Sequence, residues 1–140
     1  MPSRRRLARV AAMQAVFEMQ VRDTDPEISL EKNIGELGGT EAVDVSYAST
    51  LLSGVRKSLD DIKTAVQDSA PEWPLDRMDS ITRAILIIGA FELLYSKDAP
   101  PAVVMNEAIE VAKEYGTAES AKFVNGVLNA LAHRTDKKPQ

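Results

Sequence analysis

The sequence contains no cysteine and a single histidine, His133, near its C-terminal end. The absence of cysteine excludes disulfide bonds, thiol catalysis and cysteine-ligated zinc or iron–sulfur sites. One histidine cannot build the two- or three-histidine metal sites, and the usual nucleophile–base pairs of covalent catalysis are missing as well. We therefore expect a protein that is not an enzyme and that carries no metal or other cofactor.

Long apolar runs are also lacking. No stretch of about 18 apolar residues is present, so nothing predicts a membrane-spanning helix. The arginine-rich N-terminus has neither the apolar stretch nor the cleavage site of a signal peptide, and its continuation into a core-forming helix disfavours a mitochondrial presequence. We expect a soluble protein of the reducing cytoplasm, with no membrane partner.

The chain has 140 residues, of which 44% are hydrophobic, enough for one domain with a sizeable core. Apolar residues recur at helical spacing, and no segment alternates with a two-residue period. The pattern predicts an all-α, compact, single-domain bundle of six or seven helices over residues 1–134. Residues 135–140 are expected to form a solvated C-terminal tail.

Helix signals divide the chain into segments. We expect helices over 3–21, from Pro26 to the glycines at 38–39, over 42–69, over 79–96, from Pro101 to Gly116, and after a capping Thr117. The segment 79–96 is apolar around almost its whole circumference, which predicts a central buried helix. A buried strand over 84–91 is the competing interpretation, but the run is long for a strand and contains no turn.

Charge is unevenly placed along the chain. Residues 1–20 hold Arg4, Arg5, Arg6 and Arg9 against one acid, Glu18, a net +3, so the other 120 residues carry −7 of the total −4. The positive end of a helix dipole disfavours cations at its N-terminus, whereas a bound polyanion would offset that cost through arginine–phosphate contacts. Phosphate binding, a solvated charged terminus and binding to a membrane surface all remain open.

Helical spacing also predicts which way some of these side chains face. Arg5 and Arg9 share a row beside the apolar stripe, where they could face a ligand, and Arg6 is expected in a frayed first turn. On the last helix Phe123 lies about 90° from the core stripe, next to Gly126, where it could offer a base-stacking platform. Packing of another helix against Gly126 is the alternative. Glu107, Glu110, Lys113 and Glu114 are expected on a solvated helix face.

Five segments in order resemble NusB-type transcription antitermination factors: RRLARVAAMQAVF (5–17), LLSGV (51–55), AILIIGAFEL (84–93), NEAIEVAKEYG (106–116) and SAKFVNGVLN (120–129). The resemblance implies an all-helical protein without enzymatic activity. It implies binding of boxA-type single-stranded RNA together with ribosomal protein NusE, within an RNA polymerase antitermination complex on ribosomal RNA operons.

The resemblance also implies RNA-contacting residues. In this sequence they are Arg4, Arg5, Arg6, Arg9, Phe17, Glu119, Lys122 and Phe123. Relatives often carry a basic residue where Ile87 stands here, which reduces the expected basic surface, and Arg83 is a candidate replacement. The alternative function is a protein-interaction module or homodimer with incidental RNA binding, in which the basic terminus pairs with the acidic body of a second copy.

Overall fold

The computed structural model describes residues 2–96 and 98–136, without the side chains of residues 135 and 136. This part of the chain contains seven α-helices, two short 3₁₀ helices and no strand, so the predicted all-α class is confirmed. In chain order the elements are α1 (Arg4–Arg22), α2 (Pro26–Glu36), η1 (Gly39–Glu41), α3 (Val45–Lys57), α4 (Leu59–Ser69), η2 (Leu75–Arg77), α5 (Ser80–Leu94), α6 (Pro101–Tyr115) and α7 (Ala118–Asp136).

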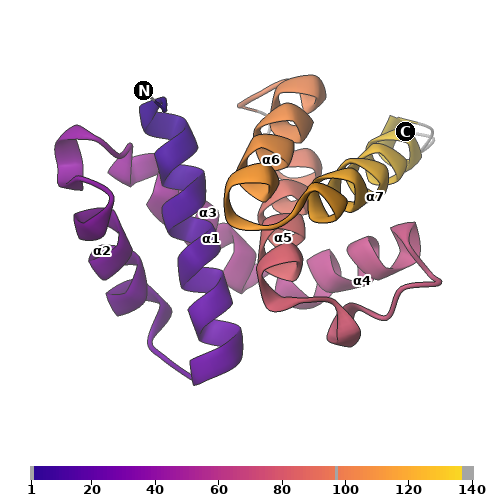
Figure 1. Ribbon diagram of the computed structural model, residues 1–140, viewed down its shortest axis with the longest axis horizontal. Coiled ribbons are helices and arrows are strands. Elements are labelled where there is room, and N and C mark those ends of the chain that lie inside the picture. Colours follow the sequence, from indigo (N-terminus) through magenta and orange to yellow (C-terminus); the bar gives the residue numbers. More distant parts are fainter. Residues whose placement is uncertain (1, 97, 137–140) are drawn as a thin grey trace.

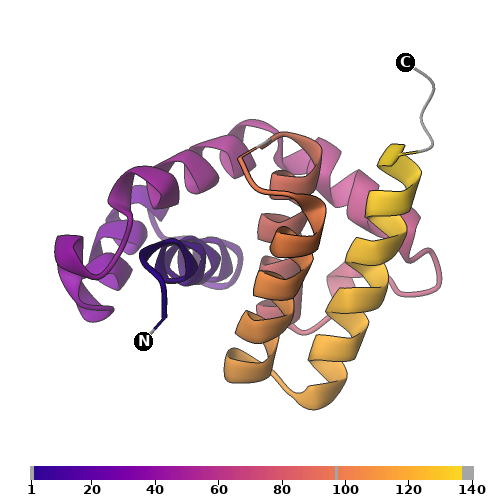
Figure 2. The same ribbon diagram turned by 90° about the horizontal axis from the view of Figure 1, so that it is seen from above.

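Helix α5 lies at the centre of the molecule, as predicted for the apolar segment 79–96. Eleven of its fifteen residues are buried, and α1, α3, α4, α6 and α7 all pack against it. Figures 1 and 2 show α1, α2 and α3 on one side of α5 and α4 and α7 on the other, with α6 lying over α5 between α1 and α7. The helix is apolar all round because it is covered on all sides.

Polar side chains cap the starts of several helices, and two of these caps, Asp25 and Thr117, are the predicted ones. Ser3 accepts a hydrogen bond from the Arg6 amide at the start of α1, and Asp25 accepts one from the Glu27 amide before Pro26. Thr117 likewise accepts a bond from the Ser120 amide at the start of α7. Each cap satisfies an amide that has no partner within its helix, which fixes where the helix begins.

The single helix predicted over 42–69 is wrong. Residues 42–44 precede the helix, and Ser58, at φ −119° and ψ 23°, divides the rest into α3 and α4. Hydrogen bonds continue across the break, from the Ser58 amide to Gly54 and from the Ile62 amide to Ser58. The two helices pack against different neighbours, α3 on α1 and α4 on α7, and a straight helix could not reach both. Neither proline nor glycine marks the break.

Two further expectations concern the chain ends and membranes. The expected tail, 135–140, lies outside the residues whose side chains are described, although the backbone of α7 continues to Asp136. Within the described ranges, no helix combines the length and the apolar character needed to cross a bilayer.

The close approach of α3 and α5 yields a stability prediction. A Cβ atom added at Gly54 would lie 2.2 Å from the ring of Phe91, which is itself buried and stacked on Tyr95. We expect Gly54→Ala to lower the free energy of unfolding by about 1–3 kcal/mol, because the ring must move. Urea denaturation followed by circular dichroism measures the change.

The matched control is Gly35→Ala in α2, where an added Cβ would meet nothing within 4 Å. This variant should be as stable as the parent or gain up to about 1 kcal/mol, because alanine favours the helix. A Gly54→Ala protein as stable as Gly35→Ala would contradict the packing described here.

Candidate nucleic-acid interface

A buried ion pair joins the first helix to the central one. The Arg9 guanidinium donates to both oxygens of Glu92, with Nε–Oε1 at 2.7 Å and Nη2–Oε2 at 3.0 Å. The two side chains are 7% and 2% exposed. The hydroxyl of Tyr47 on α3 donates to Glu92 Oε2 at 2.7 Å. The carboxylate is thus fully engaged in a place where an unpaired charge would be costly.

Helix α6 adds a second carboxylate to this cluster. The Arg6 Nε atom donates to Glu107 Oε2 at 3.1 Å, and its Nη2 atom donates to the same oxygen. Arg9 Nη1 also reaches Glu107 Oε1, at 3.4 Å. We name the five residues Arg6, Arg9, Tyr47, Glu92 and Glu107 the ionic cluster. It draws its members from α1, α3, α5 and α6.

The two remaining arginines lie outside the ionic cluster and nearer the solvent. Arg4 donates to the carbonyl oxygens of Thr40 and Val43, at 3.2 and 3.3 Å. The Arg5 guanidinium lies 4.1 Å from the centre of the Tyr47 ring, and its Nε atom is 3.8 Å from Asp44 Oδ2. Arg5 is 46% exposed, so its charge can still meet a phosphate.

Hydrogen bonding and burial within the ionic cluster shift its pKa values. Burial raises the pKa of Tyr47 to about 12, and the adjacent Glu92 carboxylate adds to the shift. Burial lowers the pKa of Arg9, but the bond and attraction to Glu92 outweigh it, so the net direction is upward. The bond to Glu107 raises the pKa of Arg6. The phenol stays neutral and both guanidinium groups stay charged at any physiological pH.

The sequence-based orientation of the arginines needs two corrections. Arg5 and Arg9 do share a row, since both lie over the Tyr47 ring, but the row faces α3 and Arg9 is buried. Arg6 is not in a frayed turn, because Ser3 caps the helix and Glu107 binds the side chain. Both corrections have one cause, which is that carboxylates of distant helices meet the arginines.

The expectation of a solvated acidic face on α6 is wrong for Glu107, whose side chain is 12% exposed. Its neighbours Glu110 and Lys113 do pair on the surface, at 3.6 Å. Glu92 and Tyr47 were missed from the sequence. A signal for Glu92 existed, since it is the one charged residue in the apolar stretch 84–95 and a charge there needs a buried partner.

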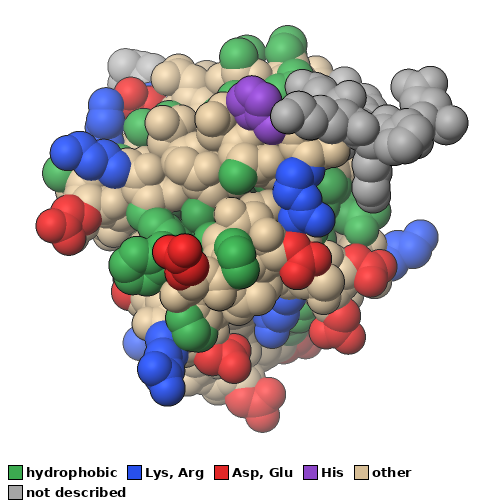
Figure 3. Space-filling view, turned by 90° about the vertical axis from the view of Figure 1, so that its right-hand side faces the viewer, with side chains coloured by type: hydrophobic (Ala, Val, Ile, Leu, Met, Phe, Trp, Pro, Cys, Tyr) green, Lys and Arg blue, Asp and Glu red, His purple; other side chains and the backbone are tan. Residues whose placement is uncertain are grey.

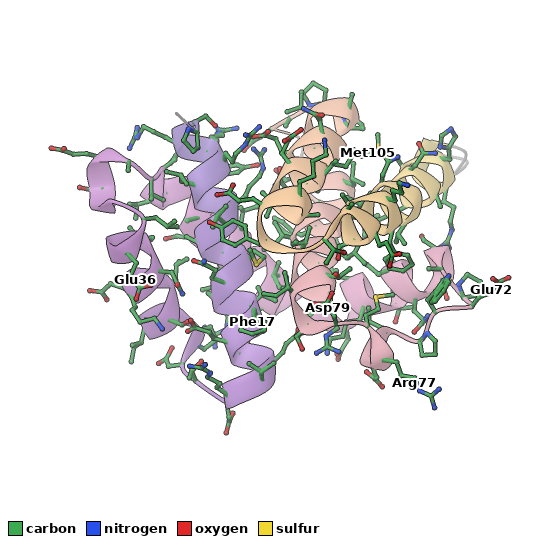
Figure 4. All side chains as sticks on the ribbon, viewed as in Figure 1. Phe17, Glu36, Glu72, Arg77, Asp79 and Met105 are labelled. Atoms are coloured by element: carbon green, nitrogen blue, oxygen red, sulfur yellow. The ribbon has the colours of Figure 1, made fainter. Side chains whose placement is uncertain are left out.

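The other candidate residues lie on the second half of α1 and at the starts of α5 and α7. Arg83 at the start of α5 donates to Gln20 Oε1 at 3.1 Å and to the Leu75 carbonyl at 3.3 Å. Glu119 and Phe123, on the first turns of α7, line one groove with Ile81 of α5. Figure 4 places the labelled Phe17 and Asp79 in this lower half of the molecule, away from the arginine end of α1.

The aromatic candidates differ in exposure. Phe17 is half-buried and packs on the core, as its place on the apolar stripe suggests. Phe123 is also half-buried, and its ring meets Trp73 edge-on at 5.7 Å. Beside Phe123, Lys122 and Gly126 are exposed. Within the described part of the chain no helix packs over Gly126, since an added Cβ there would meet nothing within 4 Å.

Ile87, at which the resemblance implies a loss of basic surface, does not lie at the surface of this structure. Ile87 is completely buried among the core residues of α5. Arg83 therefore does not stand in for it at the surface, and is held instead between α1 and η2.

The candidate residues thus form two separate groups. The N-terminal group contains the four arginines, and the second group contains Phe17, Arg83, Glu119, Lys122 and Phe123. From Arg6 to Gln20 the helix axis rises about 21 Å, at 1.5 Å per residue. Among the residues that the structure describes, no three His, Cys, Asp or Glu side chains come together in a way that could hold a metal ion.

Comparison with known proteins shows the family to which this fold belongs. The NusB family profile matches residues 6–133. The chain belongs to the NusB family. A curated relative from Halalkalibacterium halodurans, named transcription antitermination protein NusB, is 39% identical over 125 residues, which cover 89% of this chain and 90% of the relative. The family is one of antitermination factors, not of enzymes.

Solved structures agree with the assignment to the NusB family. NusB of T. maritima superimposes with a TM-score of 0.83 at 36% identity, covering 95% of this chain and 93% of that one. A chain from a crystal structure of antitermination factors NusB and NusE with double-stranded RNA gives a TM-score of 0.81 at 24% identity, covering 92% and 96%. The second likeness shows the shared fold.

The ionic cluster predicts a large stability effect at Arg9. Replacing Arg9 by methionine leaves the Glu92 carboxylate buried without its cation, which should cost about 3–5 kcal/mol of the free energy of unfolding. Urea denaturation measures the change. Arg56→Met is the matched control, because Arg56 is 47% exposed and lies 3.9 Å from Glu27, and it should cost within about 0.5 kcal/mol. Equal losses in the two variants would contradict the buried pairing.

The raised pKa of Tyr47 predicts that the free energy of unfolding falls in alkaline solution. Its folded-state pKa of about 12 lies above the ordinary value of 10, so the neutral phenol stabilises the fold fully below pH 10. That contribution is lost as the pH rises from 10 through 12. In a spectroscopic titration, Tyr47→Phe should lack the tyrosinate transition near pH 12. If the variant instead loses a transition near pH 10, Tyr47 is not buried against Glu92.

Proposed function

We propose that this protein is a transcription antitermination factor that binds boxA-type RNA together with ribosomal protein NusE. Membership of the NusB family carries the proposal, because the family profile and the curated relatives cover almost the whole chain. The related structure that holds NusB, NusE and double-stranded RNA supports both partners. The complex would act with RNA polymerase on ribosomal RNA operons in the cytoplasm.

The N-terminal group supplies phosphate contacts in this proposal. Arg4 and Arg5 keep their guanidinium groups at the surface, and Arg6 is about one-third exposed beside Glu107. Arginine can contact phosphate through two N–H groups at once. Arg9 acts as a positioning residue, since it holds Tyr47, over which Arg5 lies, and does not itself reach the solvent.

The second group supplies contacts to bases. Phe123 offers part of an aromatic ring for stacking, and the exposed carboxylate of Glu119 can accept hydrogen bonds from base amino groups. Lys122, next to Phe123, supplies a cation for the adjacent phosphate. Unpaired bases are the ones that can reach such side chains, so we propose single-stranded RNA as the ligand.

The homodimer alternative gains nothing from the structure. It was based on a basic terminus in need of acidic partners from a second copy. Asp44, Glu92 and Glu107 of the same chain already contact the arginines. A homodimer that buries the arginine-rich end would therefore gain less electrostatic stabilisation than the sequence suggests.

Salt dependence of RNA binding tests the phosphate contacts. About two to three phosphates are within reach of Arg4, Arg5 and Arg6, and each should contribute about −0.7 to the slope of log K against log salt, giving about −1.4 to −2.1. Fluorescence anisotropy with a boxA-like oligonucleotide, alone, as a duplex and as a scrambled control, with and without NusE, measures it. Arg5→Gln should flatten the slope by about 0.7.

The matched control is Arg56→Gln, because Arg56 is as exposed as Arg5 but lies at the far end of α3. Its slope and affinity should equal those of the parent protein. Binding that does not respond to salt, or that prefers the scrambled oligonucleotide, would contradict the proposed function.

A further inference from the structure

The single tryptophan of the chain lies exposed in a connection between helices. Trp73 is 58% exposed, although indole is a large apolar ring that proteins usually cover. It stands between Pro71 and Pro74 in the segment joining α4 to α5. Figure 3 shows the side of the molecule formed by the ends of α4 and α7, where hydrophobic side chains lie among acidic and basic ones.

The backbone around Trp73 is held in place by one amide side chain. Gln67 Nε2 donates to the carbonyl oxygens of Ala70, at 3.1 Å, and Trp73, at 2.8 Å, while Gln67 Oε1 accepts from the Leu75 amide at 2.7 Å. The Trp73 amide donates to the Ala70 carbonyl at 3.0 Å. The exposed ring is therefore presented by an ordered segment, which lowers the entropy lost on binding.

Trp73 and Phe123 are in contact but do not stack face to face. Their planes meet at 75°, an edge-to-face arrangement in which one ring edge covers a single face. Two open grooves meet at this pair, of about 410 and 780 Å³. The smaller groove runs from Trp73 past Lys122 to Gly126 on α7. Flat ligands can enter it beside the indole.

Charged side chains of both signs surround the pair, with cations in reach of phosphates and carboxylates in reach of bases. Lys122 borders the smaller groove, and Arg77 borders the larger one, where Figure 4 shows its side chain pointing outward from η2. Three carboxylates, Glu72, Asp79 and Glu119, line the same grooves. Asp79 is engaged in capping α5, whereas Glu72 and Glu119 can accept from base amino groups. Cations beside stacked aromatic rings are the usual composition of a single-strand binding surface.

We propose that Trp73 is a base-stacking residue, and that one nucleobase of the bound RNA lies on its indole face in the groove leading to Gly126. This inference rests on the proposed function and extends the RNA path from Phe123 onto the segment between α4 and α5. Trp73 and Phe123 then provide two successive aromatic positions, set at an angle to each other, so that the strand bends as it passes from one to the next.

Because Trp73 is the only tryptophan, its own fluorescence reports on the contact. The full-length protein is titrated with the single-stranded boxA-like oligonucleotide, and tryptophan emission and oligonucleotide anisotropy are recorded in parallel. Stacking of a base should quench the emission, and both signals should give the same dissociation constant. NusE is added in a separate titration before the RNA.

Two variants separate stacking from folding. Trp73→Leu keeps an apolar side chain without an aromatic face and should weaken binding roughly 5- to 150-fold, whereas Trp73→Phe should keep most of the affinity. Gly126→Leu leaves the indole in place but fills the groove beside it. Leucine favours a helix, so this variant should stay folded and bind RNA more weakly than the parent protein. Urea denaturation confirms that each variant is folded.

The outcomes distinguish this inference from the function on which it rests. The stacking role alone is overturned if anisotropy shows RNA binding, the tryptophan emission of the parent protein does not change, and Trp73→Leu binds RNA as tightly as the parent. Emission that changes on adding NusE, and not on adding RNA, would place Trp73 in a protein interface and overturns it too. No RNA binding by the parent protein, with or without NusE, overturns both.

Discussion

The arrangement of the helices depends on one buried ion pair, Arg9 with Glu92. A charge in the interior is tolerated only when its hydrogen-bonding capacity is met, so Glu92 requires Arg9 and the Tyr47 hydroxyl at the same time. These three residues come from α5, α1 and α3, and Glu107 adds α6. The ionic cluster therefore adds a polar constraint on the positions of these helices to the constraint set by their apolar packing.

This requirement gives the arginine-rich terminus a structural purpose. The positive end of the α1 dipole is compensated by carboxylates of the same chain, so a ligand is not needed to explain the arginines. The surface charge left for RNA is smaller than a count of arginines suggests. Stacking on aromatic side chains and the surface of NusE gain weight in the proposed binding mode for that reason.

Much of the fold could be predicted from the sequence, because helix caps and apolar periodicity act locally. The caps Asp25 and Thr117 and the buried helix α5 are examples. The break at Ser58 could not be predicted, since it arises from the different neighbours of α3 and α4. The RNA contacts themselves are still predictions, but the structure decides which candidates reach the surface. Spacing placed Arg5 and Arg9 on one row correctly, yet only the meeting of distant helices shows which of the two is covered.

Helix α1 connects the two groups of candidate residues as a rigid rod. The ionic cluster holds the first turns of α1, and near the end of α1 the Gln20 side chain accepts a hydrogen bond from Arg83. Deleting or inserting one residue between them would rotate one end by about 100° and move it by 1.5 Å. The contacts at both ends could not then form together, so changes in chain length should be tolerated in the connections of this protein and not within its first helix.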